Sequence, residues 1–238
     1  ALTLQNGLGN LETIAAVVGA ARAVQGVTSH GATLLGPGRV RHAGQGPTHL
    51  ATRPAIGDQL NAVAALFTQA GFEVHLSDNL DGLIWGKLIV NAGINPLTAI
   101  LRVPNGRLAE VEPARALMVA AVDEAARVAR AKGITLPYDD PQQQAVTVAV
   151  ATAPNRSSML ADVLRSAPTE IEFINGAIVR AAMELGIPTP VNQALVRLVK
   201  AIEATYPTNS FANSPTSRTR SMSPSGGISS DMPSTRRG

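Results

Sequence analysis

The stretch of sequence that decides the fold is residues 83–100, which read LIWGKLIVNAGINPLTAI. Within this mostly apolar run, Lys87, Asn91 and Asn95 follow one another at intervals of four residues. Residues four apart lie on one face of an α-helix, and that face drifts by about 40° at each step. The stretch therefore predicts a largely apolar helix that carries a lysine and two amides in one polar row.

Two interpretations of this polar row stay open from the residues alone. In the first, the helix belongs to a core and turns the row towards water, where most charged side chains lie. In the second, the row lines a cleft, because apolar neighbours flank it on both sides and buried polar groups need partners. A lysine in a partly apolar cleft can have a lowered pKa and donate a proton, so the second interpretation predicts a site with chemistry.

Helical periodicity dominates the chain after residue 79. Pro113 and Gly133 mark a helix start and a helix end, since proline favours first turns and glycine follows last turns. Thr169 and Glu172 have the spacing of a capping box, which predicts another helix start. The expected helices cover 80–92, 95–101, 113–132, 141–151, 158–166, 169–185 and 191–204.

Short strand-like runs alternate with helical ones before residue 79. Gly36, Pro37 and Gly38 predict the turn of a β-hairpin, and Asn10 is a residue type that caps helices. The expected strands cover 1–5, 24–35, 39–43, 48–52 and 72–76, and the expected helices cover 10–18 and 58–70. This part of the chain is therefore predicted to be α/β.

The predicted fold class is α/β plus all-α, with an α/β domain at 1–78 and a helical domain at 79–206. Residues 207–238 are rich in Ser, Pro and Gly with scattered Arg, and we expect them to be disordered because they bury too little apolar surface to offset ordering entropy. Residues 1–206 carry equal numbers of basic and acidic side chains, so the net charge of +3 arises in the tail. A neutral body argues against a nucleic-acid-binding face.

Other classes of protein are excluded by what the sequence lacks. It has no cysteine, so it has no disulfides and no thiolate metal ligands. No apolar run reaches about 18 residues, and no signal peptide is recognisable, so we expect no membrane partner and a cytoplasmic location. The first residue is Ala rather than Met, so the natural start stays open. We expect no metal site, because metal-ligand spacing is absent among the four histidines, His30, His42, His49 and His75.

Glu170 and the segment around residues 155–158 are further candidates with ordinary structural interpretations beside the functional ones. Glu170 follows a predicted cap, where the helix dipole alone favours an acidic residue. Asn155 and Ser158 precede or begin a predicted helix, where they serve as caps or present donors to an anion. The glycines of residues 7–12 do not complete a dinucleotide fingerprint, because Glu12 occupies the third glycine position.

Six motifs, in order along the chain, resemble those of the ketopantoate reductase (2-dehydropantoate 2-reductase) family. The helix pattern K-x-x-x-N-x-x-x-N-P-L-T-A and the later pair SSML and TEIEFING are specific in combination. The resemblance covers about residues 2–205. The matching segments are LQNGLGN at 4–10, SHGA at 29–32, LIWGKLIVNAGINPLTAI at 83–100, PNG at 104–106, NRSSMLADV at 155–163 and PTEIEFINGAIVR at 168–180.

The resemblance implies a fold, a reaction and a cofactor. The family has an N-terminal Rossmann domain that binds NADPH, a helical C-terminal domain, and a cleft between them that holds the 2-keto acid. It reduces 2-dehydropantoate to pantoate on the route to pantothenate and coenzyme A. By resemblance, Lys87 is the general acid that protonates the ketone oxygen, and Glu170 is the acidic partner that orders the site and binds substrate.

The resemblance also implies the binding residues. Asn91 and Asn95 are expected to hold hydroxyl or carbonyl groups of the substrate, and Ser158 its carboxylate. Asn6 is expected to face cofactor and substrate, and Asn155 the cofactor side. A homodimer is left open.

The family's glycine fingerprint has no counterpart in this sequence. At roughly 30 residues per βαβ unit, about 90 residues are expected to precede Leu2. We therefore expect a truncated chain, for which a non-catalytic helical association domain is the alternative function. A related 2-keto acid reductase is the other alternative.

Because the residues that grip the pyrophosphate are absent, we expect residues 1–238 alone to bind NADPH weakly. A calorimetric titration measures this affinity. A dissociation constant in the low micromolar range or tighter would place the nucleotide site within these residues and contradict the expectation.

Overall fold

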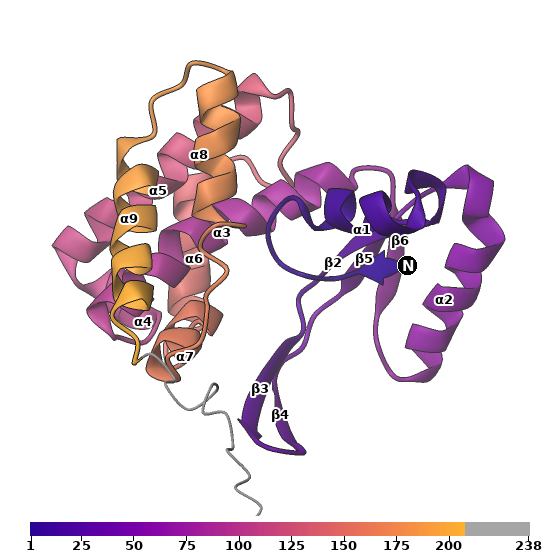
Figure 1. Cartoon of the computed structure of the whole chain (residues 1–238), viewed down its shortest axis with the longest axis horizontal. Coiled ribbons are helices and arrows are strands. Elements are labelled where there is room, and N and C mark those ends of the chain that lie inside the picture. The colour runs from indigo at the N-terminus through magenta and orange to yellow at the C-terminus, as the bar shows by residue number, and fades with distance from the viewer. Residues whose placement is uncertain (208–238) are drawn as a thin grey trace, which may run out of the picture. The chain divides into compact units, whose positions relative to one another are not determined.

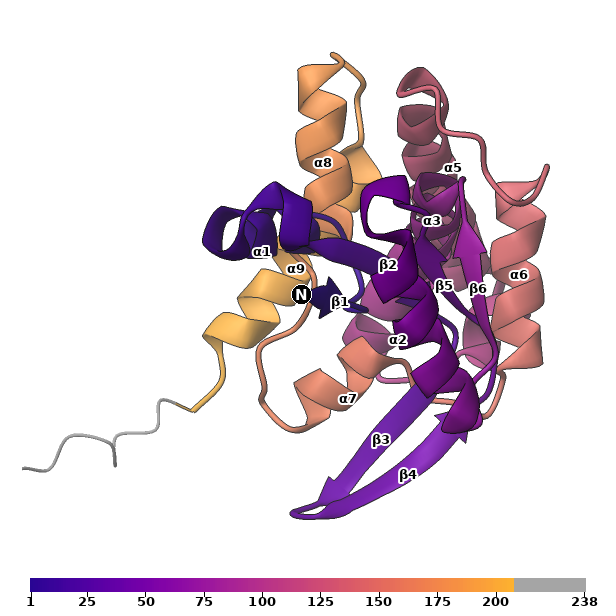
Figure 2. The same cartoon turned by 90° about the vertical axis from the view of Figure 1, so that its right-hand side faces the viewer.

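The structure is a computed structural model, and it describes residues 1–207. A four-stranded mixed sheet has the order β1-β2-β5-β6, in which β1 and β2 are parallel, β5 and β6 are parallel, and β2 and β5 are antiparallel. A separate antiparallel hairpin, β3–β4, extends away from this sheet (Figures 1 and 2). The strands are β1 (Leu2–Thr3), β2 (Val24–Thr28), β3 (Gly31–Gly36), β4 (Arg39–Gly44), β5 (Thr48–Ala51) and β6 (Val74–Ser77).

The helices α1 (Asn10–Val18) and α2 (Gly57–Gln69) lie between strands of the sheet in sequence. All described elements after β6 are helical. This arrangement confirms the predicted fold class of an α/β remainder followed by a helical part. The boundary at residues 78 and 79 stays a prediction. The later helices are α3 (Leu80–Leu101), α4 (Gly106–Glu110), α5 (Glu112–Ala131), α6 (Pro141–Ala151), α7 (Ser158–Leu164), α8 (Asn175–Glu184) and α9 (Pro190–Ala204).

Helix α3 joins the two parts, because its first half contacts β2 and β5 and its length packs against α5, α6, α7 and α9 (Figure 1). Sixteen of its 22 residues are buried. The helix is long and apolar enough to cross a bilayer, yet 78% of its 18-residue apolar segment is buried inside the protein. Its apolar residues therefore serve the protein core, where Leu88 and Ile89 are among the largest fully buried side chains.

The prediction of two helices at 80–92 and 95–101 is wrong, because α3 continues through Pro96. A proline inside a helix lacks the N–H that would bond the carbonyl four residues earlier, and its ring crowds that carbonyl. Here the carbonyl of Ala92 instead accepts a hydrogen bond from Asn175 Nδ2 at 3.0 Å. A donor from another helix thus replaces the missing bond, and the helix does not end.

The predicted helix at 169–185 starts later than expected. Residues 170–174 form a turn, and α8 begins at Asn175. Thr169 makes no capping box with Glu172. Its backbone N–H and its hydroxyl both donate to Glu203 Oε1 on α9, each at 2.7 Å. The carboxylate of Glu203, from a distant part of the chain, thus binds Thr169 in place of Glu172.

The strand predicted at 24–35 is divided into β2 and β3. The backbone N–H of Ser29 donates to the carbonyl of Pro47 at 2.9 Å, and that of His30 donates to Thr28 Oγ1 at 3.2 Å. The first bond continues the register of β2 with β5, but Pro47 has no N–H to return a bond, so the pairing ends here and β3 leaves the sheet.

The predicted hairpin turn at residues 36–38 is confirmed. Asn10 is not a cap, because Gly9 holds that position and the Asn10 side chain donates to the Asn6 carbonyl at 3.0 Å. The tail predicted to be disordered lies outside the described residues, apart from Pro207.

The burial pattern predicts how the two parts exchange their amide hydrogens. Residues 83–92 and 113–132 should exchange more slowly than residues 1–35, because the former lie in buried helices and β1 has one neighbouring strand in the described chain. Hydrogen exchange followed by mass spectrometry measures this. Equal protection of both parts would contradict it.

Candidate functional site

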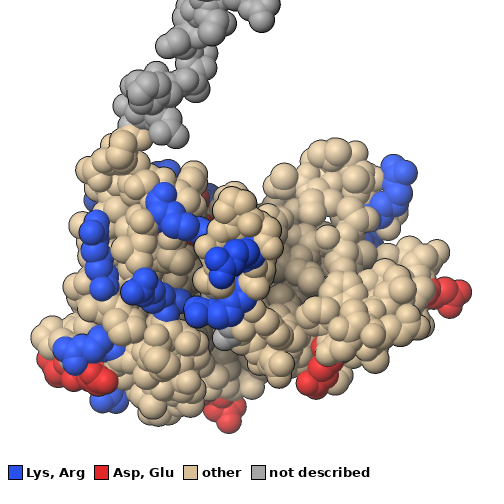
Figure 3. Space-filling view, turned by 90° about the horizontal axis from the view of Figure 1, so that it is seen from below, with Lys and Arg blue, Asp and Glu red and all other residues tan. Residues whose placement is uncertain are grey.

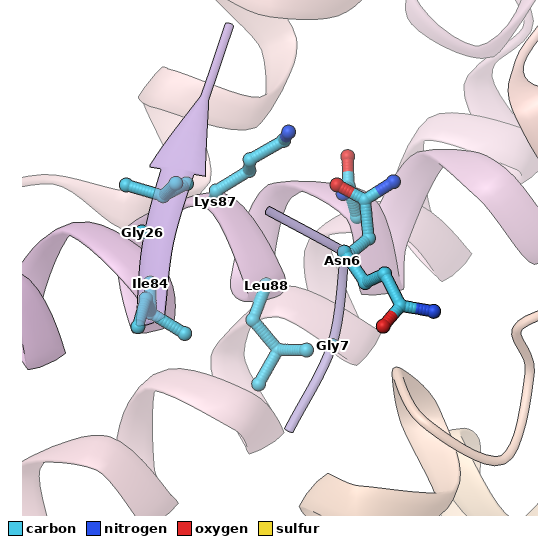
Figure 4. Close-up of a pocket in the computed structure, with 9 residues that line it drawn as sticks. Asn6, Gly7, Gly26, Ile84, Lys87 and Leu88 are labelled. Atoms are coloured by element: carbon cyan, nitrogen blue, oxygen red, sulfur yellow. The ribbon is translucent and has the colours of Figure 1, made fainter. Parts of the chain in front are cut away.

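Lys87 lies where α3 passes beneath the carboxyl end of β2. Its Nζ donates a hydrogen bond of 2.6 Å to the backbone carbonyl of Thr28, the last residue of that strand. Figure 4 shows the lysine between β2, which carries Gly26, and the loop of Asn6 and Gly7. These residues surround a small pocket, whose full lining is Gln5, Asn6, Gly7, Gly26, Val27, Ile84, Lys87, Leu88 and Asn91.

The loop after β1 is fixed by a close approach to the turn before α8. The backbone N–H of Leu8 donates to the carbonyl of Phe173 at 2.9 Å. Gly7 has φ of +87°, and a Cβ atom there would collide with the same carbonyl. Only glycine fits this position without strain, because it tolerates positive φ and has no side chain. The loop therefore needs Gly7 in order to place Asn6 beside the turn.

Asn6 and Glu170 meet across this contact, although 164 positions separate them in sequence. Asn6 Nδ2 donates to Glu170 Oε2 at 3.2 Å. Glu170 is itself held by its neighbour Thr169, which is anchored to Glu203. The structure thus brings Asn6, predicted as a cofactor contact, together with Glu170, predicted as a catalytic residue.

Burial acts on Lys87 and Glu170 in opposite directions. Desolvation lowers the pKa of Lys87, and the nearby Glu170 charge partly offsets this. Desolvation also raises the pKa of Glu170, against the hydrogen bond from Asn6 and the charge of Lys87, while Asp162 raises it further. Both shifts favour the neutral form. Lys87 gives up its proton more readily than it would in water, and Glu170 takes up a proton more readily.

The polar row of α3 continues beyond Lys87 along the predicted face. Asn91 lines the same pocket, and Asn95, one turn later, is buried. Thr98 extends the row, and its hydroxyl shares a hydrogen bond of 2.7 Å with Ser157 Oγ, which also accepts from the backbone N–H of Leu160. The sequence analysis missed this pair, although Thr98 lies three residues after Asn95 and so on the same face.

Ser158 follows Ser157 as the first residue of α7, and its side chain is exposed. This places it beside the far part of the polar row rather than next to Lys87. Asn155 is also exposed, and its backbone carbonyl accepts from the N–H of Asn105 at 3.0 Å, near the C-terminal end of α3. From Lys87 to that end the helix rises about 20 Å. The structure therefore does not bring Asn155 to the pocket.

A larger hollow of about 430 Å³ lies apart from the polar row, next to α1 and the first turn of α3. Its one basic side chain, Arg53, already donates to the backbone carbonyls of Ala20 and Ala23. It lacks the amide row, so the smaller pocket is the better candidate site. Within residues 1–207 no group of three side chains could hold a metal ion.

Basic side chains gather on the left of the face that Figure 3 shows, which is the side seen from below. Acidic side chains are sparse in the middle of that face and lie mostly near its edge. A surface of this sign attracts small anions, including carboxylates.

Two family models match the chain. The model described as "Ketopantoate reductase PanE/ApbA" matches residues 1–55, and the one described as "Ketopantoate reductase PanE/ApbA C terminal" matches residues 79–203. Together they span both the loop of Asn6 and the helix of Lys87.

Relatives named 2-dehydropantoate 2-reductase resemble the chain over most of its length. The one from Halobacterium salinarum is 40% identical over 84% of this chain and 66% of its own, and the one from Archaeoglobus fulgidus is 38% identical over 85% and 67%. The chain thus spans about two thirds of the length of these relatives.

Solved structures with the same fold include ketopantoate reductases and a dehydrogenase. A PanE/ApbA family ketopantoate reductase from Ralstonia eutropha has a TM-score of 0.77 and 38% identity, covering 85% of this chain and 66% of that one. D-mandelate dehydrogenase with NADH and anilino(oxo)acetate has a TM-score of 0.77 and 29% identity over the same shares.

The raised pKa of Glu170 predicts how stability changes with pH. A carboxyl group with a folded-state pKa above its unfolded value stabilises the fold fully below the unfolded pKa, and loses this contribution as pH rises through the folded pKa. Glu170→Gln should therefore gain stability relative to the wild type as pH rises from about 4 towards neutrality.

Denaturant unfolding across this pH range measures the difference, with the exposed Glu184→Gln as the control substitution on α8. A wild type that instead gains stability over Glu170→Gln with rising pH would show that ion pairing outweighs burial at Glu170.

Proposed function

The chain belongs to the ketopantoate reductase family, and on that basis we propose that it reduces 2-dehydropantoate to pantoate with NADPH, using Lys87 as the proton donor. The observation that carries this proposal is the pocket in which Lys87 lies beside the Asn6–Glu170 contact at the carboxyl end of β1 and β2. Ligands of open α/β sheets bind at the carboxyl ends of the strands.

Reduction of a ketone requires a hydride at carbon and a proton at oxygen. Bound NADPH would supply the hydride. The negative charge that then builds on the ketone oxygen needs a cation and a proton within reach. Lys87 offers both, because its ammonium group borders the pocket and donates to the carbonyl of Thr28, which leaves N–H groups for the substrate. Its lowered pKa makes the proton easier to release than that of an ordinary lysine.

Glu170 tunes this donor. Its charge raises the pKa of Lys87 and so keeps the amine protonated until the oxygen takes the proton. The hydrogen bond from Asn6 in turn favours the charged form of Glu170. Asn6 therefore orders the acid as well as facing the pocket.

The amides of the polar row are the proposed substrate contacts. Asn91 faces the pocket and Asn95 follows one turn later, so they offer donors and acceptors to the substrate carbonyl and hydroxyl groups. The exposed Ser158 is the proposed contact of the carboxylate, at the end of the row that Ser157 and Thr98 extend.

The residues present fit the reactive end of the cofactor. Asn6 and Gly7 lie after the carboxyl end of β1, and Gly26 on β2 lines the pocket with its backbone, since a Cβ atom there would collide with the carbonyl of His49 and the side chain of Leu50. The pocket itself holds about 10 Å³, roughly one water, so the nicotinamide would lie over its mouth beside Asn6 and Gly7 rather than inside it. Asn155 stays a prediction as a cofactor contact, and no contact in the structure supports it.

Two alternatives have specific bases. D-mandelate dehydrogenase shares the fold at 29% identity and was solved with anilino(oxo)acetate, which makes a related 2-keto acid reductase the second candidate. A non-catalytic helical association domain is less well supported, because association does not require a half-buried lysine near a half-buried acid. A homodimer and a cytoplasmic location stay predictions.

Replacing Lys87 with alanine should lower kcat for 2-dehydropantoate reduction by about 10²- to 10⁴-fold, because that is the usual contribution of a positioned proton donor. NADPH affinity should be nearly unchanged. Steady-state kinetics and calorimetry on the natural polypeptide at its full natural length measure both, with exposed Lys132→Ala as the matched control.

Retention of more than about a third of kcat in Lys87→Ala, with loss of activity in Glu170→Ala, would reverse the two roles. A second readout is the pH profile of kcat/KM. The rate should be lost as pH rises through the lowered pKa of Lys87, and Glu170→Gln should move this alkaline limb to lower pH.

A further inference from the structure

A buried chain of hydrogen bonds crosses four helices behind the candidate site. It begins at the carbonyl of Ala92 on α3, which Pro96 leaves without its intrahelical donor. Asn175 Nδ2, at the start of α8, donates to this carbonyl at 3.0 Å and also to Asn192 Oδ1 at 2.9 Å. Asn175 and Asn192 are both fully buried.

The chain then passes from α9 to α5. Asn192 Nδ2 donates to the carbonyl of Ala121 at 3.0 Å and to Glu124 Oε2 at 2.8 Å. The carboxylate of Glu124 also accepts the backbone N–H groups of Val191 and Asn192, each at 2.9 Å, and so caps the first turn of α9. Within the described residues Asn175 Oδ1 is buried without a partner, so the network holds these helices through the donors of Asn175 and Asn192 and the carboxylate of Glu124.

The position of Asn175 gives this network a bearing on the site. Ala92 lies directly after Asn91 and one turn before Pro96. Asn175 therefore binds the backbone of α3 between Asn91 and Asn95 of the polar row. On its own side, Asn175 follows the turn of residues 170–174, which is closed by hydrogen bonds from Phe173 and Ile174 to the carbonyl of Glu170. The same turn receives the loop of Asn6 through the Phe173 carbonyl.

We propose that Asn175 is a positioning residue, which holds the segment that carries Glu170 in fixed register with the polar row of α3. The proposal rests on the proposed function for its kinetic consequence. Asn175 does not line the pocket. It acts through the Ala92 carbonyl, and it can do so because Pro96 has freed that carbonyl.

The test is a double-mutant cycle between Asn175→Ala and Pro96→Ala. In the Pro96 background, Asn175→Ala leaves the Ala92 carbonyl without a donor, and kcat/KM should fall by roughly 10- to 100-fold, since displacements near 1 Å have such effects. Alanine at 96 restores the backbone N–H to Ala92, so Asn175→Ala should then lower kcat/KM by less than about threefold.

Stability separates this role from a purely structural one. Asn175→Ala should lower the denaturation midpoint in both backgrounds, because Asn192 Oδ1 loses its donor in both. Asp140→Ala removes the cap of α6 instead, and it should lower the midpoint without a matching loss of kcat/KM. An equal loss of kcat/KM in the two Asn175→Ala backgrounds, or none in either, would overturn the proposal.

Hydrogen exchange of residues 91–101 provides a test that does not depend on enzyme activity. Asn175→Ala should speed exchange there, and Pro96→Ala should reverse the effect. If the wild type reduces no 2-keto acid, the proposed function fails. The exchange measurement still decides whether Asn175 holds α3 in place. Unchanged exchange would overturn the positioning role even in an active enzyme.

Discussion

Burial of α3 is the constraint on which the rest of the structure depends. A helix with 16 of its 22 residues buried cannot leave its polar groups without partners, because an unpaired buried donor or acceptor costs about 1–3 kcal/mol. Three of its polar groups are tied to three different elements. Lys87 bonds β2, the Ala92 carbonyl bonds α8, and Thr98 bonds the start of α7.

The same burial that stabilises the core creates the chemistry of the site. Lys87 and Glu170 are partly shielded from water, so the pKa of the amine falls and that of the acid rises. At neutral pH neither shift serves stability, since a charged form that is poorly solvated weakens the fold. Sites of this kind give up stability for reactivity, and the bond that Glu170 accepts from Asn6 and the bond that Lys87 donates to Thr28 hold the two groups in place.

Much of the fold followed from local patterns, whereas several element boundaries did not. Helical periodicity located α1, α5, α6 and α9 to within a residue or so, and the Gly-Pro-Gly turn located the hairpin. Pro96 and Thr169 misled the prediction, because each was read by its usual local effect. In the structure, Asn175 and Glu203 supply the partners that change both outcomes, and they lie 79 and 34 positions away.

The sequence by itself determined the polar row, because residues four apart share a helix face whatever surrounds the helix. It also determined the family resemblance, which the comparisons confirmed. Only the tertiary structure decided that Asn6 meets Glu170, that Asn155 lies away from the pocket, and that Asn175 holds α3 through Ala92. These facts depend on how helices pack across long separations in the chain, and no local periodicity encodes such distances.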